Sequence, residues 1–421
     1  MTQALMIFNK QQNTKRRQQM RLARTIKNPE TYISNIKDTD RFSVDNIVVE
    51  HRKNNPKRDY LFVNKKQCKH IPCNPDDMIN MCKELAYKVS DALNPNLNVL
   101  VIAFAETATA IGNVVADNLM QCKYVMQTTR EKVENSRELL TFEEEHSHAT
   151  TQKLLTYSDE RAVDLNEFNY ILFVEDEIST GNTILNFIKA FEKIQPNMKF
   201  GVASVCNWQD EENKKKFIEK DIDTFALITG TLKDKDAKML GEKEQSLIDE
   251  DAFENSRDQL ENIKRIVYCV DTGSKGSLFR RERLGHTPRR YIPALYEHID
   301  NMLDVNTQSV RVIGTEEFMY IPIKIAEHIK HKGIETLCHS TTRSTIDVLH
   351  DNSTGLDDSI KCRHKIKSVY DKERPTQIYN LNEYTDLILF VTDTMLDGQT
   401  VNDLYNALGY YADKVVLITL Y

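Results

Sequence analysis

The sequence predicts an α/β protein made of two related units, each built on a parallel β-sheet. Short apolar runs rich in β-branched residues alternate with stretches of helical apolar spacing, which is typical of strands joined by crossover helices. Several landmarks also occur twice in the same order. Thr-Thr-Arg occupies residues 128–130 and 341–343, 213 positions apart, and strand-end aspartates lie 217 positions apart at Asp176 and Asp393. This near-constant spacing indicates a diverged duplication of one α/β unit.

The elements of the first unit follow the order expected of such a sheet. An apolar run at residues 98–104 predicts a strand, and residues 110–119 predict the helix after it. A second strand at residues 170–174 leads through a polar turn into a helix at residues 184–191. The closing strands are predicted at residues 200–208 and 223–232.

The second unit repeats this order. Residues 310–329 again contain an apolar strand, a Gly/Thr/Glu turn and a helix, and residues 387–408 mirror the second strand and helix of the first unit. Strands that alternate with helices imply a parallel sheet covered on both faces. Ligands of such sheets lie beyond the carboxyl ends of the strands, so the turns at those ends are where we expect a site.

Composition divides the chain into four segments. They are a basic N-terminal arm (1–40), the first unit (41–235), a charged linker with a basic Gly/Arg segment (236–305) and the second unit (306–421). The basic segment could close over an anionic substrate or form a plain surface patch. Its arginines are Arg280, Arg281, Arg283, Arg289 and Arg290.

Charge and hydropathy narrow the location and the partners. The net charge of -7 gives no general attraction to nucleic acid or to an anionic membrane, so neither is expected as a partner. No apolar run approaches the roughly 20 residues that span a bilayer, and the first residues lack a signal peptide. A cytoplasmic location is therefore expected. The eight cysteines contain no CxxC pair, which favours buried reduced thiols over a zinc site.

The turn after residues 170–174 combines two opposite kinds of chemistry. Glu175 and Asp176 come first, and Ser179–Thr183 follow just before the predicted helix. Backbone N–H groups and hydroxyls at a helix N-terminus favour a phosphate. Carboxylates repel a phosphate, so the two acids must face sugar hydroxyls or a divalent cation. A phosphorylated sugar satisfies both ends, and the alternative is an ordinary capped helix start.

This turn resembles the phosphoribosyl pyrophosphate (PRPP) signature of the type I phosphoribosyltransferases. From about Asp59 onward the chain is similar to the phosphoribosyltransferase found in bacterial tellurite-resistance and stress-response gene clusters. The second unit resembles the companion TRSP domain, named for its Thr-Arg-Ser-Pro motif, and is a degenerate repeat. Thr345 stands where that motif has proline, which removes a backbone constraint but no charged or hydrogen-bonding group.

The resemblance implies pentosyl transfer from PRPP to a base or amine, with pyrophosphate leaving. It implies that Glu175 and Asp176 hold the ribose hydroxyls directly or through Mg2+, and that Ser179–Thr183 cradle the 5-phosphate. The turn Ala105–Thr109 would donate backbone N–H groups to the pyrophosphate. The implied PRPP-binding residues are Ala105, Glu106, Thr107, Glu175, Asp176, Ser179, Thr180, Gly181, Asn182 and Thr183.

The polar stretch at residues 128–152 lies where the family carries a mobile loop over the pyrophosphate. Arg130, His146 and His148 are the predicted catalytic groups, because a guanidinium and imidazoliums can meet leaving-group charge. The alternative is a solvent-exposed polar loop. A basic cluster could reach the same anion or be plain surface, and it consists of Lys65, Lys66, Lys69 and His70.

The second unit has changed its phosphate loop. Aligned on the first unit, it has Thr392 for Glu175, Leu396 for Ser179 and Asp397 for Thr180. A carboxylate in a phosphate cradle is repulsive, so this copy is not expected to bind PRPP. Its other polar residues could hold a different ligand, or the unit could serve only for packing and oligomerisation. The candidate ligand residues are Gly314, Glu316, Glu317 and Arg343.

Two classes of function therefore remain. One is a phosphoribosyltransferase that makes or salvages a nucleoside-like product. The other is a non-enzymatic sensor that keeps the PRPP or nucleotide pocket and assembles with itself or with operon-encoded proteins. A phosphorelay receiver leaves the Ser-Thr-Gly-Asn-Thr loop unexplained, and a P-loop motif is absent from the sequence. The acceptor base and the reaction direction stay open.

Overall fold

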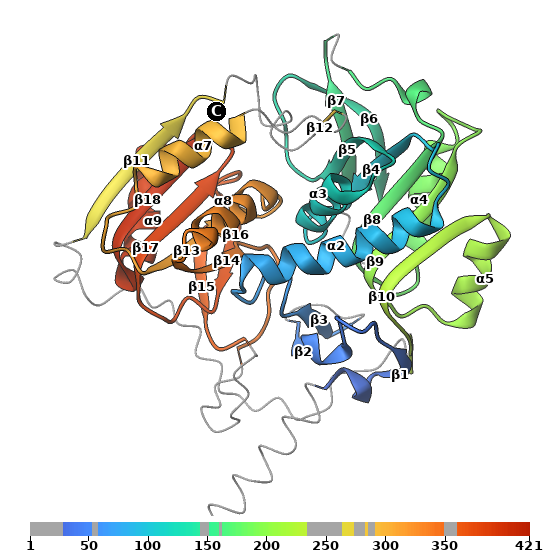
Figure 1. The fold of residues 1–421 in the computed structure, drawn as a ribbon, viewed down its shortest axis with the longest axis horizontal. Coiled ribbons are helices and arrows are strands. Elements are labelled where there is room, and N and C mark those ends of the chain that lie inside the picture. Colours follow the sequence, from blue (N-terminus) through green and yellow to red (C-terminus); the bar gives the residue numbers. More distant parts are fainter. Residues whose placement is uncertain are drawn as a thin grey trace, which may run out of the picture.

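The computed structural model describes residues 28–52, 58–143, 151–159, 162–233, 263–272, 283–284, 291–348 and 360–421. Most of the basic N-terminal arm, the charged linker and the basic Gly/Arg segment lies outside these residues. Two α/β units lie side by side, each with a central sheet covered by helices (Figure 1). None of the described helices combines the length and the apolar character needed to cross a bilayer.

The first unit contains most of the strands. Its elements are η1 (Pro29–Thr31), β1 (Ile33–Lys37), η2 (Val44–Asn46), β2 (Ile47–His51), β3 (Tyr60–Asn64), α2 (Pro75–Ala92), β4 (Val99–Ala103), α3 (Thr109–Asn118), β5 (Cys122–Thr129), β6 (Ser136–Glu143), β7 (Thr151–Tyr157), η3 (Leu165–Glu167), β8 (Tyr170–Ile178), α4 (Asn182–Phe191), β9 (Lys199–Asn207), α5 (Glu211–Glu219) and β10 (Ile222–Leu232).

The second unit is smaller. Its elements are β11 (Lys264–Val270), β12 (Arg283–Leu284), α7 (Tyr291–Asp300), β13 (Ser309–Gly314), α8 (Tyr320–His331), β14 (Glu335–Ser340), β15 (Arg363–Lys367), β16 (Pro375–Tyr379), β17 (Thr385–Thr392), α9 (Gly398–Leu408), η5 (Gly409–Tyr411) and β18 (Ala412–Leu420).

The first sheet has a parallel centre and antiparallel edges. Its order is β1-β10-β9-β8-β4-β5-β7-β6, with the short strand β12 beside β5. The five strands from β10 to β5 are parallel, whereas β1, β7, β6 and β12 pair antiparallel. Every residue of β4 is buried, as expected of a strand with helices on both faces.

The second sheet has five parallel strands in the order β11-β18-β17-β13-β14. This order matches β10-β9-β8-β4-β5 of the first unit strand for strand. One difference is that β11 precedes the other strands in the chain, whereas β10 follows its own. The hairpin β15–β16 also corresponds to the hairpin β6–β7. In the chain, β6–β7 lies between β5 and β8, and β15–β16 lies between the corresponding strands β14 and β17. The predicted α/β class with two parallel-sheet units is confirmed.

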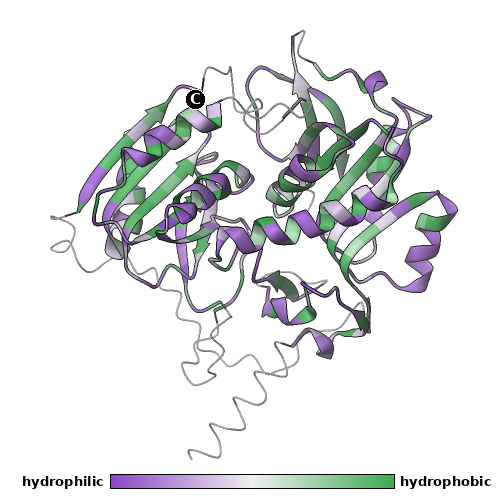
Figure 2. Cartoon of the chain, viewed as in Figure 1, coloured by the Kyte–Doolittle hydropathy of each residue, from purple (hydrophilic) through white to green (hydrophobic). Residues whose placement is uncertain are grey.

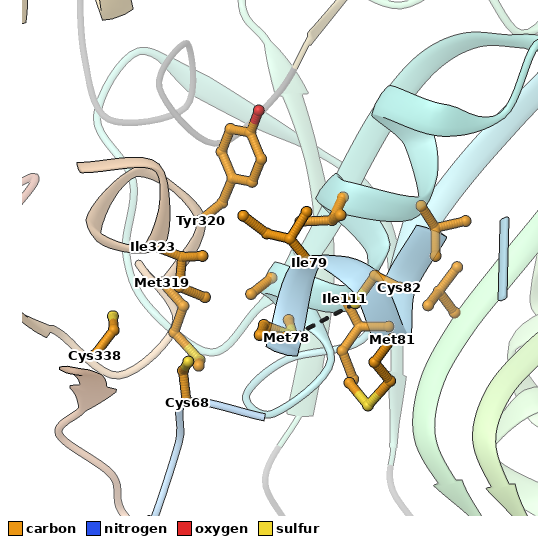
Figure 3. Close-up of a cluster of buried hydrophobic side chains, with 14 of the residues drawn as sticks. Cys68, Met78, Ile79, Met81, Cys82, Ile111, Met319, Tyr320, Ile323 and Cys338 are labelled. Atoms are coloured by element: carbon orange, nitrogen blue, oxygen red, sulfur yellow. Dashed lines mark hydrogen bonds between the residues drawn. The ribbon is translucent and has the colours of Figure 1, made fainter. Parts of the chain in front are cut away.

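The two units share an apolar core at their junction. Helix α2 runs across from one unit to the other and contacts α3, α8 and β14 (Figure 1). Figure 2 shows apolar residues on the strands and polar residues on the outer helix faces. In Figure 3, Met78, Ile79 and Cys82 of α2 face Met319 and Ile323 at the start of α8. These residues belong to one continuous cluster of buried side chains, so the units form one folded body.

Candidate functional site

The acidic turn after β8 lies next to the turn after β4. Gln67 connects them, because its Nε2 donates to the Thr107 carbonyl at 2.9 Å and to Asp176 Oδ2 at 3.4 Å. Burial raises the pKa of Asp176, and the negative charge of Glu177 acts in the same direction. The structure therefore brings together two of the predicted PRPP-binding residues, Thr107 and Asp176, at the carboxyl ends of neighbouring strands.

The third acid of the turn has its own cation. Glu177 Oε1 accepts a hydrogen bond from Arg58 Nη1 at 2.9 Å. The Arg58 guanidinium also lies over the rings of Tyr60 and Phe62, 4.6 and 4.9 Å from their centroids. Burial opposes the charge on Arg58, but Glu177 outweighs burial and raises the pKa of the guanidinium. Arg58 therefore balances Glu177, and the other two acids of the turn, Glu175 and Asp176, are half-buried.

The hydroxyl loop, residues 179–183 between β8 and α4, is held by Gln209 and Phe217. Its polar residues Ser179, Thr180 and Thr183 are half-buried. Gln209 Nε2 donates to the Thr180 carbonyl at 3.1 Å. Gly181 is buried and left-handed, with a φ of 79°, and an added Cβ would lie 2.5 Å from the Phe217 ring. Only glycine combines this backbone conformation with this space.

The helices that follow the two corresponding loops begin differently. Helix α4 has no side-chain capping bond from its N-cap residue Gly181, and the N–H of Asn182 donates only to the Thr180 hydroxyl, at 3.3 Å. Helix α9 is capped by Asp397, whose carboxylate accepts from the N–H of Thr400 at 2.8 Å. The start of α4 is thus open to an anion, while the start of α9 already holds a carboxylate.

The turn after β4 is clamped by its neighbours. The N–H of Ala105 donates to the Thr128 hydroxyl at 2.8 Å, and Gln152 Nε2 donates to the Ala105 carbonyl at 2.9 Å. In the described part of the chain, the backbone N–H groups of Glu106 and Thr107 have no hydrogen-bond partner. These two groups are the donors that the turn can offer to a bound anion.

The side chain of Glu106 points away from any such ligand. Its Oε1 lies 2.6 Å from Lys69 Nζ, and its Oε2 accepts from the backbone N–H of Arg343 at 3.3 Å. Burial alone raises the pKa of Glu106, but the charges of Lys69 and Arg343 outweigh burial and lower it to about 2. The turn therefore offers its backbone, whereas its carboxylate is held by the second unit.

The basic cluster suggested by the sequence does not form one surface. Lys69 is buried and also donates to the carbonyls of Glu316 and Thr341, at 2.7 and 3.0 Å. With Glu106 these are three acceptors for three N–H groups, so Lys69 cannot reach an anionic ligand. Burial lowers the pKa of His70 to about 3, which keeps it neutral. Lys65 and Lys66 are half-buried.

The residues predicted to hold a ligand in the second unit lie at the junction instead. Glu317 Oε2 accepts from the Thr129 hydroxyl at 2.5 Å, and its Oε1 accepts from the N–H of Arg130 at 3.0 Å. Arg343 Nε donates to Glu316 at 2.8 Å, and its Nη2 contacts Glu131. Gly314 lies beneath the same turn, where a Cβ would meet the Phe318 carbonyl at 2.8 Å.

Two further side chains complete this cluster. Arg374 donates to Glu316 and to Glu131, both at 2.8 Å, and Ser368 donates to Glu316 at 2.6 Å. Burial raises the pKa of Glu131, and Arg343 only partly opposes it. Four acids and three cations therefore meet between the units. The acids are Glu106, Glu131, Glu316 and Glu317, and the cations are Lys69, Arg343 and Arg374.

Part of the stretch predicted as a mobile loop, residues 128–152, belongs to a β-hairpin. Strands β6 and β7 pair antiparallel, and β7 joins β5 at Thr128 and Thr129. The expectation of a loop overlooked the alternating apolar residues of these strands, such as Phe142, whose ring lies 4.6 Å from that of Phe187 on α4. Arg130 is half-buried at the base of the hairpin. His146 and His148 lie outside the described residues, in the connection between β6 and β7.

Two other features lie away from these turns. Where the structure is described, three acid or histidine side chains come within reach of one metal ion at Asp76, Glu327 and His331, and not at Glu175 and Asp176. A hollow of about 710 Å³ lies between β15 and α9 and shares only Arg374 and Thr400 with the residues discussed above. Neither feature contains a residue predicted to bind PRPP.

A parallel sheet with an acidic turn and an open helix start at its carboxyl edge is typical of α/β proteins that bind phosphorylated ligands. Comparison with protein families is more specific. Residues 48–231 match the phosphoribosyl transferase family, and residues 281–408 match the TRSP domain that lies C-terminal to it. The chain therefore contains a domain of the phosphoribosyl transferase family followed by a TRSP domain.

Three solved phosphoribosyltransferase structures each match about a third of the chain. Adenine phosphoribosyltransferase from Trypanosoma brucei, in complex with AMP, pyrophosphate and ribose-5-phosphate, is 12% identical over 36% of this chain and 65% of its own, with a TM-score of 0.27. The Giardia lamblia enzyme is 18% identical over 37% of this chain and 80% of its own, with a TM-score of 0.28. The Helicobacter pylori xanthine-guanine-hypoxanthine phosphoribosyltransferase is 15% identical over 32% and 74%, with a TM-score of 0.21. No curated protein sequence matches the chain.

Proposed function

We propose that the first unit transfers ribose 5-phosphate from PRPP to a nitrogen nucleophile and releases pyrophosphate. The observation that carries this proposal is the open start of α4, set against the start of α9. Both helices follow the same kind of strand in the same kind of sheet, yet only α9 has a carboxylate at its N-terminus. A phosphate can replace a neutral hydroxyl at such a position, but a fixed carboxylate repels it.

Each part of the site has a task in this reaction. The loop Ser179–Thr183 would hold the 5-phosphate through N–H groups and hydroxyls, and Glu175 and Asp176 would accept hydrogen bonds from the ribose hydroxyls. The N–H groups of Glu106 and Thr107 would bind the pyrophosphate. Because the sugar becomes cation-like as pyrophosphate leaves, nearby carboxylates stabilise it while the fixed turns position both reacting ends.

The donor set of this turn fits Mg2+. Mg2+ binds through one or two protein carboxylates together with substrate phosphates, so Glu175 and Asp176 would suffice when PRPP is present. Arg58 balances the charge of Glu177, the third acid of this turn. When bound, Mg2+ would supply positive charge that offsets the charge of the phosphates.

In this proposal Arg130 assists the leaving group. It follows Thr128 and Thr129, which touch both the turn after β4 and the second unit. A guanidinium can meet two phosphoryl oxygens at once. We also propose that His146 and His148 meet the charge of the leaving pyrophosphate.

The test is to incubate the protein with PRPP, Mg2+ and a panel of nucleobases and amines, and to follow pyrophosphate release. We expect release with at least one acceptor. The Arg130→Ala variant should lower kcat at least tenfold while keeping PRPP binding in calorimetry. Binding of PRPP by the wild-type protein without release from any acceptor would contradict transfer and identify a sensor instead.

A further inference from the structure

The two units can be aligned through the register of their sheets. Ile102 of β4 pairs with Phe173 of β8, and Ile313 of β13 pairs with Phe390 of β17. Counting onward from these pairs places Glu106 of the first unit in the position of Glu317 in the second. The two Thr-Thr-Arg triplets then lie at the carboxyl ends of the corresponding strands β5 and β14. The two units can therefore be compared residue by residue at the junction.

The corresponding residues exchange contacts between the units. Glu317 accepts hydrogen bonds from the Thr129 hydroxyl and the Arg130 N–H of the first unit. Glu106 accepts from the Arg343 N–H of the second unit and is also hydrogen-bonded by the side chain of Thr342. Each unit's turn glutamate is thus bound by the other unit's Thr-Thr-Arg triplet. Such a self-complementary contact is characteristic of a two-fold symmetric dimer.

Other contacts follow the same approximate symmetry. Helices α3 and α8 occupy corresponding positions after β4 and β13, and they contact each other. The Tyr320 hydroxyl at the start of α8 donates to Asp117 of α3. Lys69 departs from the symmetry, because it bridges Glu106 to the backbone of Glu316 and Thr341. The second unit therefore holds the place that an identical partner would hold in a dimer.

We propose that the second unit completes the catalytic site of the first by fixing two of its elements across the junction. Arg343 holds the turn Ala105–Thr109 through Glu106, because its side-chain Nε lies 3.7 Å from Glu106 Oε2 in addition to the backbone hydrogen bond. Glu317 holds the base of the β6–β7 hairpin through Thr129 and Arg130. Both residues are positioning residues and neither touches the substrate. The catalytic consequence rests on the proposed function, whereas the structural part does not.

Burial strengthens these reciprocal contacts between the units. Glu317 has a side chain 0% exposed, so removing its carboxylate would take away the acceptor of the buried Thr129 hydroxyl. An unsatisfied buried donor costs free energy of folding. The reciprocal contacts between the units therefore fix the geometry of both elements. A junction used for packing alone would not need these polar contacts.

Amide hydrogen exchange measured by mass spectrometry tests the structural part directly. The variants are Glu317→Ala, Glu317→Gln, Arg343→Ala and Arg343→Lys, with Arg265→Ala on β11 as a matched control in the same unit. We expect Glu317→Ala to speed exchange at residues 127–131, and Arg343→Ala to speed it at residues 104–109, each at least tenfold. The Glu317→Gln variant keeps a carbonyl acceptor and should restore part of the protection.

Activity provides the second readout. In the same variants we expect KM for PRPP to rise at least tenfold, with the Arg343→Lys and Glu317→Gln variants closer to the wild type, and no change for Arg265→Ala. Unchanged exchange in both alanine variants would overturn the inference. If the wild type releases no pyrophosphate while the alanine variants still show faster amide hydrogen exchange, the result would support the reciprocal contacts between the units and contradict only the proposed function. If an alanine variant does not fold, the conservative variants decide in its place.

Discussion

Gln67 shows how one side chain can hold two parts of a site. Its amide bridges the carbonyl of Thr107 and the carboxylate of Asp176, which lie on different turns. The acids and hydroxyls of those turns could be predicted from the sequence because each group is contiguous. Gln67, Arg58 and Gln209 could not, because each acts on a residue 29 to 119 positions away. Their residue types carry no signal without the fold.

Gly181 gives a prediction at the same scale. The Gly181→Ala variant should lower the free energy of unfolding by about 1–2 kcal/mol, because its backbone is left-handed and its Cβ would meet the Phe217 ring. PRPP binding should weaken as well, since the hydroxyl loop must shift. Urea unfolding and calorimetry measure the two effects.

A matched control exists in the second unit. Gly398 is the corresponding glycine and the first residue of α9, and an added Cβ would meet no atom within 4 Å. The Gly398→Ala variant should leave stability within about 0.5 kcal/mol of the wild type. Equal losses in the two variants would show that the special conformation of Gly181 does not matter.

Among the elements, the two helix starts record how the units have diverged. The sequence alone identified Asp397 in the loop before α9 and predicted that its carboxylate would repel a phosphate. The sequence did not show that Asp397 caps α9, whereas α4 begins without a cap from Gly181. Similarly, the alternation of apolar residues in β6 and β7 was present in the sequence, but the resemblance to a mobile loop hid it.

A substitution that copies the second unit's carboxylate into the first tests the role of the helix start. The Thr180→Asp variant should weaken PRPP binding at least 100-fold, because two like charges about 4 Å apart repel by up to about 4 kcal/mol near a protein surface. Calorimetry with PRPP and Mg2+ measures the change. The isosteric Thr180→Asn variant is the control and should lose much less affinity. A similar loss in both would mean that shape, not charge, determines binding there.

For the molecule as a whole, the spacing of repeated landmarks predicted two units, but not their contact. Arg343 and Glu106 are 237 positions apart in the chain. No local pattern reports that the two will meet, since the junction depends on how two complete sheets pack. The residues assigned to a second ligand were therefore recognised as a group, while their partners in the first unit were missed.

The buried charges of the junction predict a dependence of stability on pH. The pKa of Glu106 is about 2 in the folded protein and 4.5 in its ordinary state, so its charge stabilises the fold above pH 4.5. That stabilisation is lost as the pH falls from 4.5 toward 2. Urea unfolding at pH 5 and pH 3 should show a decrease of a few kcal/mol.

Comparison with the Glu106→Gln variant isolates this group. The variant should be less stable than the wild type at pH 5, and the difference should shrink toward pH 3 because glutamine does not titrate. Glu131 acts in the opposite sense, since burial raises its pKa and its charge costs stability above pH 4.5. A difference between wild type and variant that stays constant with pH would contradict the role given to Glu106.

The position of β11 has a consequence for the covalent connection between the units. Because β11 fills the outer place of the second sheet from the N-terminal side, each sheet obtains its five parallel strands from one uninterrupted half of the chain. A single backbone cut between β10 and β11 would therefore sever no strand and no described hydrogen bond of the junction. The two fragments should reassociate after separate synthesis, and β12, which belongs to the C-terminal fragment, would still add to the sheet of the other.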